Sequence, residues 1–266
     1  MRTGVRPKGR FAASLALANG QYTGCAIGFF IKVTLLTKRL VASPQKGGYS
    51  KWNEDLMLPM QPTASDHVAF LPRVSRDERA VIFQQRGAVV WLTGISGADK
   101  STLARACERQ LIEAGRFAYV LDGDEVRQGL SRDLGFSPAD RHEQIRRVGE
   151  VARLFADAGA IVIVALISPY AADRAAARAC AAELTFLKVH VDASLGHCET
   201  RDTKGLYRQA RSGAIENLTG LGSPYEVPAA PDLRLNTGEQ SVAESMTVLW
   251  QLMTSRGLLP TRALPG

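Results

Sequence analysis

Apolar and polar positions along this chain form blocks that predict strands and helices in alternation. Short apolar runs are typical of buried strands; they cover residues 89–92, 117–121, 161–167, 187–191 and, more weakly, 233–236. Apolar residues that recur every three or four positions predict helices; these cover residues 101–114, 124–130, 141–158, 171–182 and 241–256. This alternation predicts an α/β fold, in which a parallel sheet carries helices on both faces.

One more helix is predicted ahead of the first strand. Ser75 is followed by Arg-Asp-Glu, which is typical of a capped helix start with acidic residues in the first turn. Ala80, Val81 and Phe83 are expected on the inner side of this helix. We therefore predict that the folded domain runs over residues 75–260.

Residues 1–74 show no sustained periodicity and carry most of the excess positive charge. Nine of the 33 Lys and Arg residues, and no Asp or Glu, lie within residues 1–53, so the rest of the chain has 24 basic and 26 acidic residues. The net charge of +7 therefore does not predict nucleic-acid binding by the domain. We expect a basic, poorly ordered extension; a transit segment, or a true initiator at Met57 or Met60, are the alternatives.

Two further observations bear on the compartment. The apolar stretch that ends at Leu36 is interrupted by Lys32 and is too short to cross a bilayer, so no membrane association is expected. The four cysteines, at positions 25, 107, 180 and 198, have no C-x-x-C spacing. This spacing favours reduced thiols and a cytoplasmic protein over disulfides or zinc.

The segment after the first strand carries the clearest chemical signal. It matches the phosphate-binding pattern G-x-x-x-x-G-K-[ST], except that Asp99 stands at the second glycine. In such a loop, backbone N–H groups surround the phosphates, the lysine reaches the outer phosphates and the hydroxyl binds Mg²⁺. The expected ATP-binding residues are Gly94, Ile95, Ser96, Gly97, Ala98, Asp99, Lys100, Ser101 and Thr102.

Asp99 is expected to weaken ATP binding. A carboxylate about 6 Å from a phosphate is repelled by roughly 3 kcal/mol at an effective dielectric constant of about 20. Because Asp99 also precedes a predicted helix, its side chain is expected to lie against the free N–H groups of the first turn in the empty protein. We therefore expect Asp99→Gly to tighten ATP binding.

Other polar clusters follow predicted strands. Asp122 and Asp124 end the second strand and could bind hydrated Mg²⁺ or accept a proton from a reacting hydroxyl. Simple capping of the next helix is the structural alternative. Arg127, Phe136 and Arg141 follow, and guanidinium groups with an aromatic ring suit a ligand that has a flat base and an anion.

These residues lie within stretches that resemble the adenylylsulfate (APS) kinase family. The matches over residues 75–259 include Trp-Leu-Thr-Gly-Ile-Ser-Gly, Leu-Asp-Gly-Asp, Asp-Leu-Gly-Phe-Ser, Ile-Ser-Pro-Tyr, Lys-Gly-Leu-Tyr and Pro-Tyr-Glu. The resemblance implies a P-loop NTPase-type three-layer sandwich. It also implies a kinase that uses ATP and Mg²⁺ to phosphorylate the 3′-hydroxyl of adenosine 5′-phosphosulfate (APS), giving 3′-phosphoadenylyl sulfate for sulfate assimilation.

The resemblance further implies roles for single residues. Asp122 and Asp124 would lie nearest the attacking hydroxyl, with Ser101 and Asp122 at the metal. Lys204 would begin a mobile lid over residues 203–225. The implied catalytic residues are Lys100, Asp122, Asp124 and Ser168. The implied substrate-binding residues are Asp124, Arg127, Phe136, Arg141, Gln144, Ile145, Ile167, Ser168, Lys204, Leu218 and Thr219.

Several positions depart from the family pattern; they are Asp99, Glu125, Gln128, Gln144, Leu218 and Gly222. Since the family has an aromatic residue at position 218, Leu218 would give the adenine slot an aliphatic wall. Two alternatives therefore stay open: an impaired kinase-like protein that binds APS or a sulfurylase partner, and a P-loop kinase for another nucleotide or a small alcohol. APS is the expected small-molecule partner, ATP sulfurylase a candidate protein partner, and a homodimer the expected assembly.

Overall fold

The computed structural model describes residues 73–260, and a five-stranded sheet forms its centre. The strands are β1 (Ala88–Thr93), β2 (Ala118–Asp122), β3 (Ile161–Ala165), β4 (Thr185–Asp192) and β5 (Leu233–Asn236). Their order across the sheet is β2-β3-β1-β4-β5, and every pairing is parallel. All five predicted strands are present, so the predicted α/β fold is confirmed.

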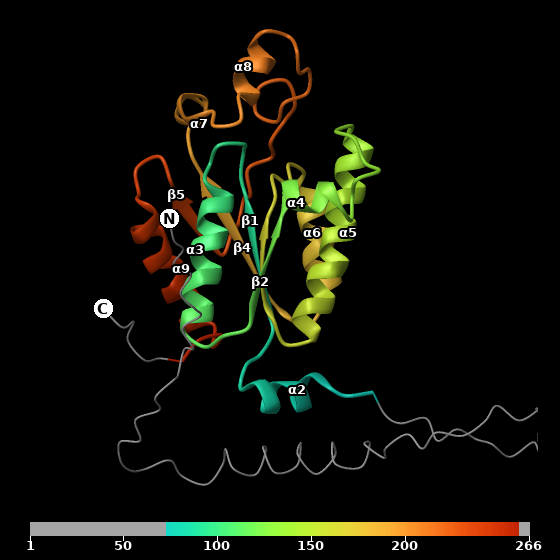
Figure 1. Cartoon of the computed structure of the whole chain (residues 1–266), viewed down its shortest axis with the longest axis vertical. Coiled ribbons are helices and arrows are strands. Elements are labelled where there is room, and N and C mark those ends of the chain that lie inside the picture. Colours follow the sequence, from blue (N-terminus) through green and yellow to red (C-terminus); the bar gives the residue numbers. More distant parts are fainter. Residues whose placement is uncertain (1–72, 261–266) are drawn as a thin grey trace, which may run out of the picture. The chain divides into compact units, whose positions relative to one another are not determined.

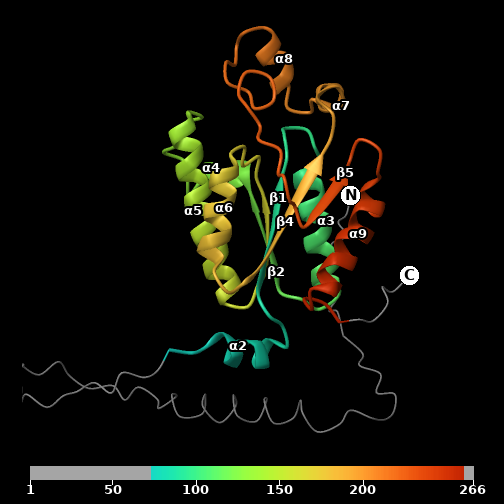
Figure 2. The ribbon, with the colours of Figure 1, turned by 180° about the vertical axis from the view of Figure 1, so that it is seen from behind.

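Helices cover both faces of this sheet (Figure 1). The described residues form α2 (Arg76–Phe83), α3 (Lys100–Glu113), α4 (Gly123–Gln128), α5 (Pro138–Asp157), α6 (Ala171–Ala181), α7 (Leu195–Arg201), α8 (Leu206–Arg211) and α9 (Val242–Ser255). Of these, α2, α7 and α8 lie beyond the ends of the strands and not on a face of the sheet (Figure 1). The sequence did not predict α7 and α8, because six or seven residues are too few to establish a helical period. The view from behind shows α3 and α9 on one side and α4, α5 and α6 on the other (Figure 2).

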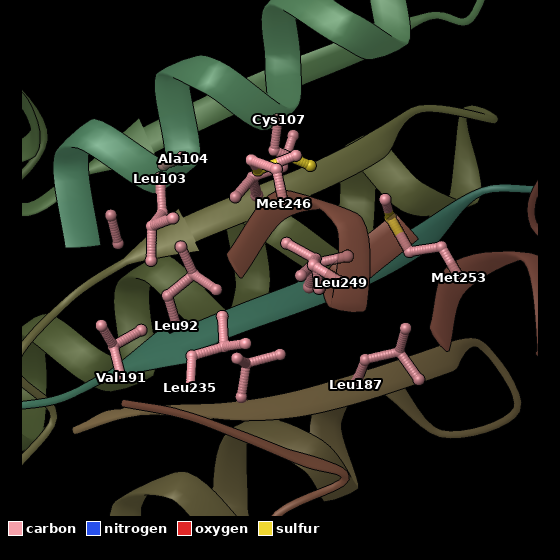
Figure 3. Packing of buried hydrophobic residues seen from close by; sticks show 14 of the residues in the cluster. Leu92, Leu103, Ala104, Cys107, Leu187, Val191, Leu235, Met246, Leu249 and Met253 are labelled. Atoms are coloured by element: carbon pink, nitrogen blue, oxygen red, sulfur yellow. The ribbon is translucent and has the colours of Figure 1, made fainter. Parts of the chain in front are cut away.

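Two apolar layers result from the alternation of side chains along the central strand. Val90 and Leu92 of β1 point into a buried cluster with α3 and α9, which includes Leu103, Leu249 and Met253 (Figure 3). Val89 and Trp91 point the other way, into a second cluster with residues of α5 and α6. Both faces of β1 are therefore buried, which explains why its sequence is a continuous apolar run.

The helix α2 differs from its prediction. Its capping box is confirmed, since the Ser75 and Glu78 side chains each accept from the other's backbone N–H. The expected apolar inner side is wrong: α2 buries no residue, and Val81 and Phe83 are 78% and 52% exposed. Polar contacts hold the helix instead, such as the bond from Arg79 to the Asp157 carboxylate at 3.1 Å.

The expectations about membrane spans and cysteines can be compared with the structure over residues 73–260. None of the helices there has the length and hydropathy needed to span a bilayer. Cys107, Cys180 and Cys198 are free thiols there, the first and last of them buried. Cys25 and the predicted N-terminal extension up to residue 72 lie outside the described residues.

Candidate active site

The loop between β1 and α3 has a backbone that requires unusual residues at three positions. A Cβ atom at Gly94 would lie 2.2 Å from the Val191 carbonyl oxygen, so only glycine fits there. Gly97 has φ +77° and Asp99 has φ 60°, both in the left-handed region. Aspartate enters this region more readily than most residues with a side chain, so Asp99 can take a glycine's place without changing the loop.

The Asp99 carboxylate does not lie where the sequence predicted. Asp99 is the N-cap residue of α3, but its side chain makes no hydrogen bond to the first-turn N–H groups. The carboxylate instead forms an ion pair with Arg201 at the end of α7. The free N–H groups of α3 therefore remain available to a bound anion.

Lys100 lies in the mouth of the loop. Its ammonium group donates a 2.7 Å hydrogen bond to the Ile95 carbonyl oxygen, and the residue is only 8% exposed. Burial lowers the pKa of Lys100 to about 8, because the charged form loses its hydration. The ammonium is thus held at the loop, and phosphate charge nearby would favour its protonated form.

Ser101 and Asp122 meet between α3 and the end of β2. The Ser101 hydroxyl donates to Asp122 Oδ2 at 2.5 Å, while Asp122 Oδ1 accepts from the Asp124 N–H at 3.0 Å. Hydroxyl and carboxylate oxygens are hard ligands that suit Mg²⁺, which usually takes few protein ligands and completes its shell with water and phosphate. The described residues hold no cluster of three or more His, Cys, Asp or Glu that would form a protein-only metal site. The donor set therefore fits Mg²⁺ bound together with a nucleotide.

Asp124 is the exposed member of the carboxylate pair. Its side chain is 62% exposed and forms an ion pair with Lys204, which lies in the turn between α7 and α8. Asp124 and Lys204 come from distant segments of the chain, and the sequence analysis assigned both to one site. The structure brings these two side chains together.

Arg127, Phe136 and Arg141 also come together, although the two arginines face the protein more than the sequence predicted. The Arg127 guanidinium lies 4.3 Å from the centre of the exposed Phe136 ring and donates to the Gly135 carbonyl at 2.8 Å. Arg141 is 9% exposed and donates in three directions. Its acceptors are the carbonyl oxygens of Phe136 and Asn217 and the Thr219 hydroxyl, at 3.0, 2.9 and 2.9 Å.

Ser168 lies just beyond the end of β3 and is almost fully buried. Its φ of 40° is in the left-handed region, and its hydroxyl accepts a 3.1 Å bond from Trp91 Nε1. The carbonyl oxygen of the neighbouring Ile167 accepts from Thr93 Oγ1 at 2.7 Å. Because the Ser168 side chain is 2% exposed, its hydroxyl is poorly placed to attack a phosphate.

Three other expected substrate contacts have buried side chains. Ile145 packs in the cluster under α5 and α6, and Leu218 packs in the cluster under α3 and α9, at 4% and 8% exposure. Leu218 therefore packs as an aliphatic side chain in an apolar cluster, and its expected place as a wall of the adenine slot stays a prediction. Gln144 is 5% exposed and donates to the Gly123 carbonyl oxygen at 3.5 Å.

Sequence reasoning missed several residues that tie the site together. Tyr207 in α8 donates to the Ser96 carbonyl at 2.8 Å, and the Tyr225 hydroxyl lies 3.1 Å from Thr93 Oγ1. Arg174 donates to the Ser168 carbonyl at 2.6 Å. Tyr207 and Tyr225 stand in motifs that the resemblance had already marked, which was the available signal. Nothing local marked Arg174 or the partner of Asp99.

Comparisons with known proteins agree with this geometry. The family model described as adenylylsulphate kinase matches residues 86–236. Adenylyl-sulfate kinase of Vibrio vulnificus (strain YJ016) is 50% identical over 189 residues, which cover 71% of this chain and 91% of that protein. Adenylyl-sulfate kinase of Geotalea daltonii is 52% identical over 171 residues, which cover 64% of this chain and 84% of that protein.

A solved structure of an APS kinase also matches this chain. The APS kinase of Mycobacterium tuberculosis in complex with AMPPNP and APS matches with a TM-score of 0.62 and 49% identity, over 64% of this chain and 99% of that one. The family model spans more than half of the sequence, and the relatives are matched over most of their length. This chain belongs to the adenylylsulphate kinase family.

Proposed function

We propose that this protein is an adenylyl-sulfate kinase, which transfers the γ-phosphoryl group of ATP to the 3′-hydroxyl of APS. The observation that carries the proposal is the meeting of Lys100, Ser101 and Asp122 at the mouth of a loop whose first-turn N–H groups are free. Parallel α/β sheets bind ligands at the carboxyl ends of their strands, where this loop lies.

Different residues have different roles in an in-line phosphoryl transfer. The loop N–H groups and the Lys100 ammonium bind the outer phosphates, and they stabilise the charge that moves from the γ-phosphoryl group to the leaving ADP. Ser101 and Asp122 would hold Mg²⁺, which offsets phosphate charge when bound. Positioning and charge stabilisation suffice for this reaction, so no protein nucleophile is required and Ser168 acts as a buried structural residue.

Asp124 is the proton acceptor in this proposal. Both Asp122 oxygens already accept hydrogen bonds, from Ser101 and from the Asp124 N–H. The exposed Asp124 carboxylate accepts from Lys204 through Oδ2 alone, which leaves Oδ1 for the substrate proton. As the APS 3′-oxygen forms its bond to phosphorus and the bond to the ADP oxygen breaks, the hydroxyl proton passes to Asp124. In the same proposal, Lys204 and the Arg127–Phe136 pair bind APS.

The activity is tested by ADP release from the full-length chain with MgATP, in the presence and absence of APS. We expect ADP release that depends on APS, and Lys100→Ala as the matched control should abolish it. Release with another nucleotide or a small alcohol, and none with APS, would assign a different acceptor. Tight APS binding without turnover would indicate an impaired kinase-like protein. Addition of EDTA should stop the reaction if Mg²⁺ is required.

A further inference from the structure

Asp99 introduces a negative charge into a loop that binds a polyphosphate, and the structure contains a compensating group. We propose that Arg201 is a positioning residue that holds the Asp99 carboxylate away from the phosphates, so that the loop binds ATP despite its acidic residue. This inference rests on the proposed function and adds a determinant of ATP affinity.

The backbone of Asp99 supports the first step. Because Asp99 takes up the left-handed conformation (φ 60°, ψ 21°), its N–H group can keep the direction that a glycine would give it. Its carboxylate could have capped α3, as aspartate at an N-cap commonly does. It makes no such bond, so it does not occupy the N–H groups that a phosphate needs.

Arg201 is held in place independently of Asp99. Its guanidinium donates a 3.0 Å hydrogen bond to the Thr237 carbonyl oxygen, beyond β5. Thr237 itself lies between the loop and the end of β4. Its hydroxyl is 3.3 Å from the Ala98 carbonyl oxygen and 3.2 Å from the Asp192 carbonyl oxygen, and its N–H donates to the Asp192 carbonyl at 2.9 Å. The ion pair with Asp99 is thus the second attachment of an arginine already fixed beside the loop.

The charges explain why this attachment matters. A carboxylate free to turn toward a phosphate about 6 Å away would weaken ATP binding by roughly a hundredfold before metal binding offsets it. A guanidinium in an ion pair with that carboxylate offsets its charge and keeps it beside α7. The two side chains are 31% and 28% exposed, so solvent screens the pair only in part.

The test is a double-mutant cycle on the full-length chain, with ATP affinity measured by calorimetry in the presence of Mg²⁺ and without APS. Arg201→Gln should raise the ATP Kd by roughly tenfold, because it releases the carboxylate. Asp99→Asn keeps the backbone preference but removes the charge. In the Asp99→Asn background, Arg201→Gln should therefore raise the Kd by less than about threefold. Equal effects in both backgrounds, or a larger effect in the Asp99→Asn background, would overturn the proposal.

Asp99→Asn alone is a second test that does not depend on the folding of the Arg201 variant. If Arg201 already neutralises the carboxylate, this substitution should tighten ATP binding by less than about fivefold. Tightening by about a hundredfold would show that the carboxylate faces the phosphates, and would overturn the proposal. In turnover assays, Arg201→Gln should raise the KM for ATP more than the KM for APS, whereas a structural role would raise both.

Arg79→Gln is the matched control. Arg79 forms an ion pair of similar exposure with Asp157, but it lies on α2, away from the phosphate loop. Arg79→Gln should leave the ATP Kd within about twofold of the parent value. An increase in Kd as large as that of Arg201→Gln would show that the Arg201 effect arises from net charge, and would overturn the proposal. APS-dependent ADP release by the parent tests the proposed function separately, so failure of one inference does not conceal failure of the other.

Discussion

At the scale of single residues, the burial of Lys100 is expected to make ATP affinity depend on pH. Burial lowers the pKa of Lys100 to about 8 in the empty protein, so the ammonium is present below that pH and is lost as the pH rises through it. ATP binds the protonated form, and its Kd should therefore rise roughly tenfold between pH 7 and pH 9. Calorimetric titrations at the two pH values would measure this.

Lys100→Arg is the control for this pH dependence, since a guanidinium stays charged throughout the range. The variant is expected to bind ATP more weakly but with a flat pH profile. A parent profile that is equally flat would contradict the assignment of the outer phosphates to Lys100.

Asp124 provides a second test at the residue scale. Asp124→Asn should lower kcat by about 10²- to 10⁴-fold, because an amide cannot accept the hydroxyl proton. The ATP Kd should change little, since the exposed side chain is not among the phosphate-loop contacts. Steady-state kinetics with calorimetry would separate the two effects. Glu125→Gln changes the neighbouring carboxylate in the same way and should leave kcat within about threefold; equal losses in both would remove the proton-acceptor role.

At the scale of elements, Arg141 joins α5 to the segment that the sequence marked as a lid. Its three hydrogen bonds run to Phe136, Asn217 and Thr219, and two of these acceptors lie within residues 203–225. A lysine lacks this planar fork of donors and cannot replace it. Arg141→Lys should therefore loosen the lid, with faster amide hydrogen exchange over residues 212–222 and a KM for APS raised about tenfold.

Arg146→Lys is the matched control on the same helix. Arg146 is 62% exposed and pairs only with Glu143 among the described residues, within its own helix, so the same chemical change should alter neither exchange nor KM. Unchanged exchange over residues 212–222 in Arg141→Lys would show that the lid does not depend on this contact.

At the scale of the whole molecule, stability depends on the two apolar layers on either side of the sheet. Leu249 of α9 is fully buried against the sheet (Figure 3). Leu249→Ala should lower the free energy of unfolding by about 2–5 kcal/mol, because it removes buried methyl groups and leaves a cavity. Urea unfolding of both proteins would measure the difference.

The contrast with α2 makes this prediction specific. Ile82 of α2 is 74% exposed, so Ile82→Ala should change the free energy of unfolding by no more than about 0.5 kcal/mol. A loss as large as that of Leu249→Ala would show that α2 packs against a surface outside the described residues.

The assembly is the remaining whole-molecule prediction. A homodimer is expected from the family resemblance, and light scattering after size-exclusion chromatography would give the mass directly. A mass equal to one chain of 28.8 kDa would refute it.

Local patterns determined the fold class and the chemistry of the phosphate loop. Both faces of β1 and β3 are buried, so their sequences are uninterrupted apolar runs that can be recognised without any partner. Loop residues with special backbone requirements, such as Gly97 with φ +77°, are likewise set by conformations that few residue types tolerate. Each of these features is visible as a run of residue types at adjacent positions, and for that reason the sequence alone was sufficient to predict it.

Only the tertiary structure decided where the polar and aliphatic side chains of the site point. Asp99 was predicted to face the helix amides, but the end of α7 supplies Arg201, whose charge attracts the carboxylate more directly. Tertiary packing puts the Leu218 side chain in an apolar cluster, and its predicted place in a ligand slot stays a prediction. Such choices depend on which distant segments meet at the sheet edge, because hydrogen bonding, ion pairing and burial act through space and are not encoded in local periodicity.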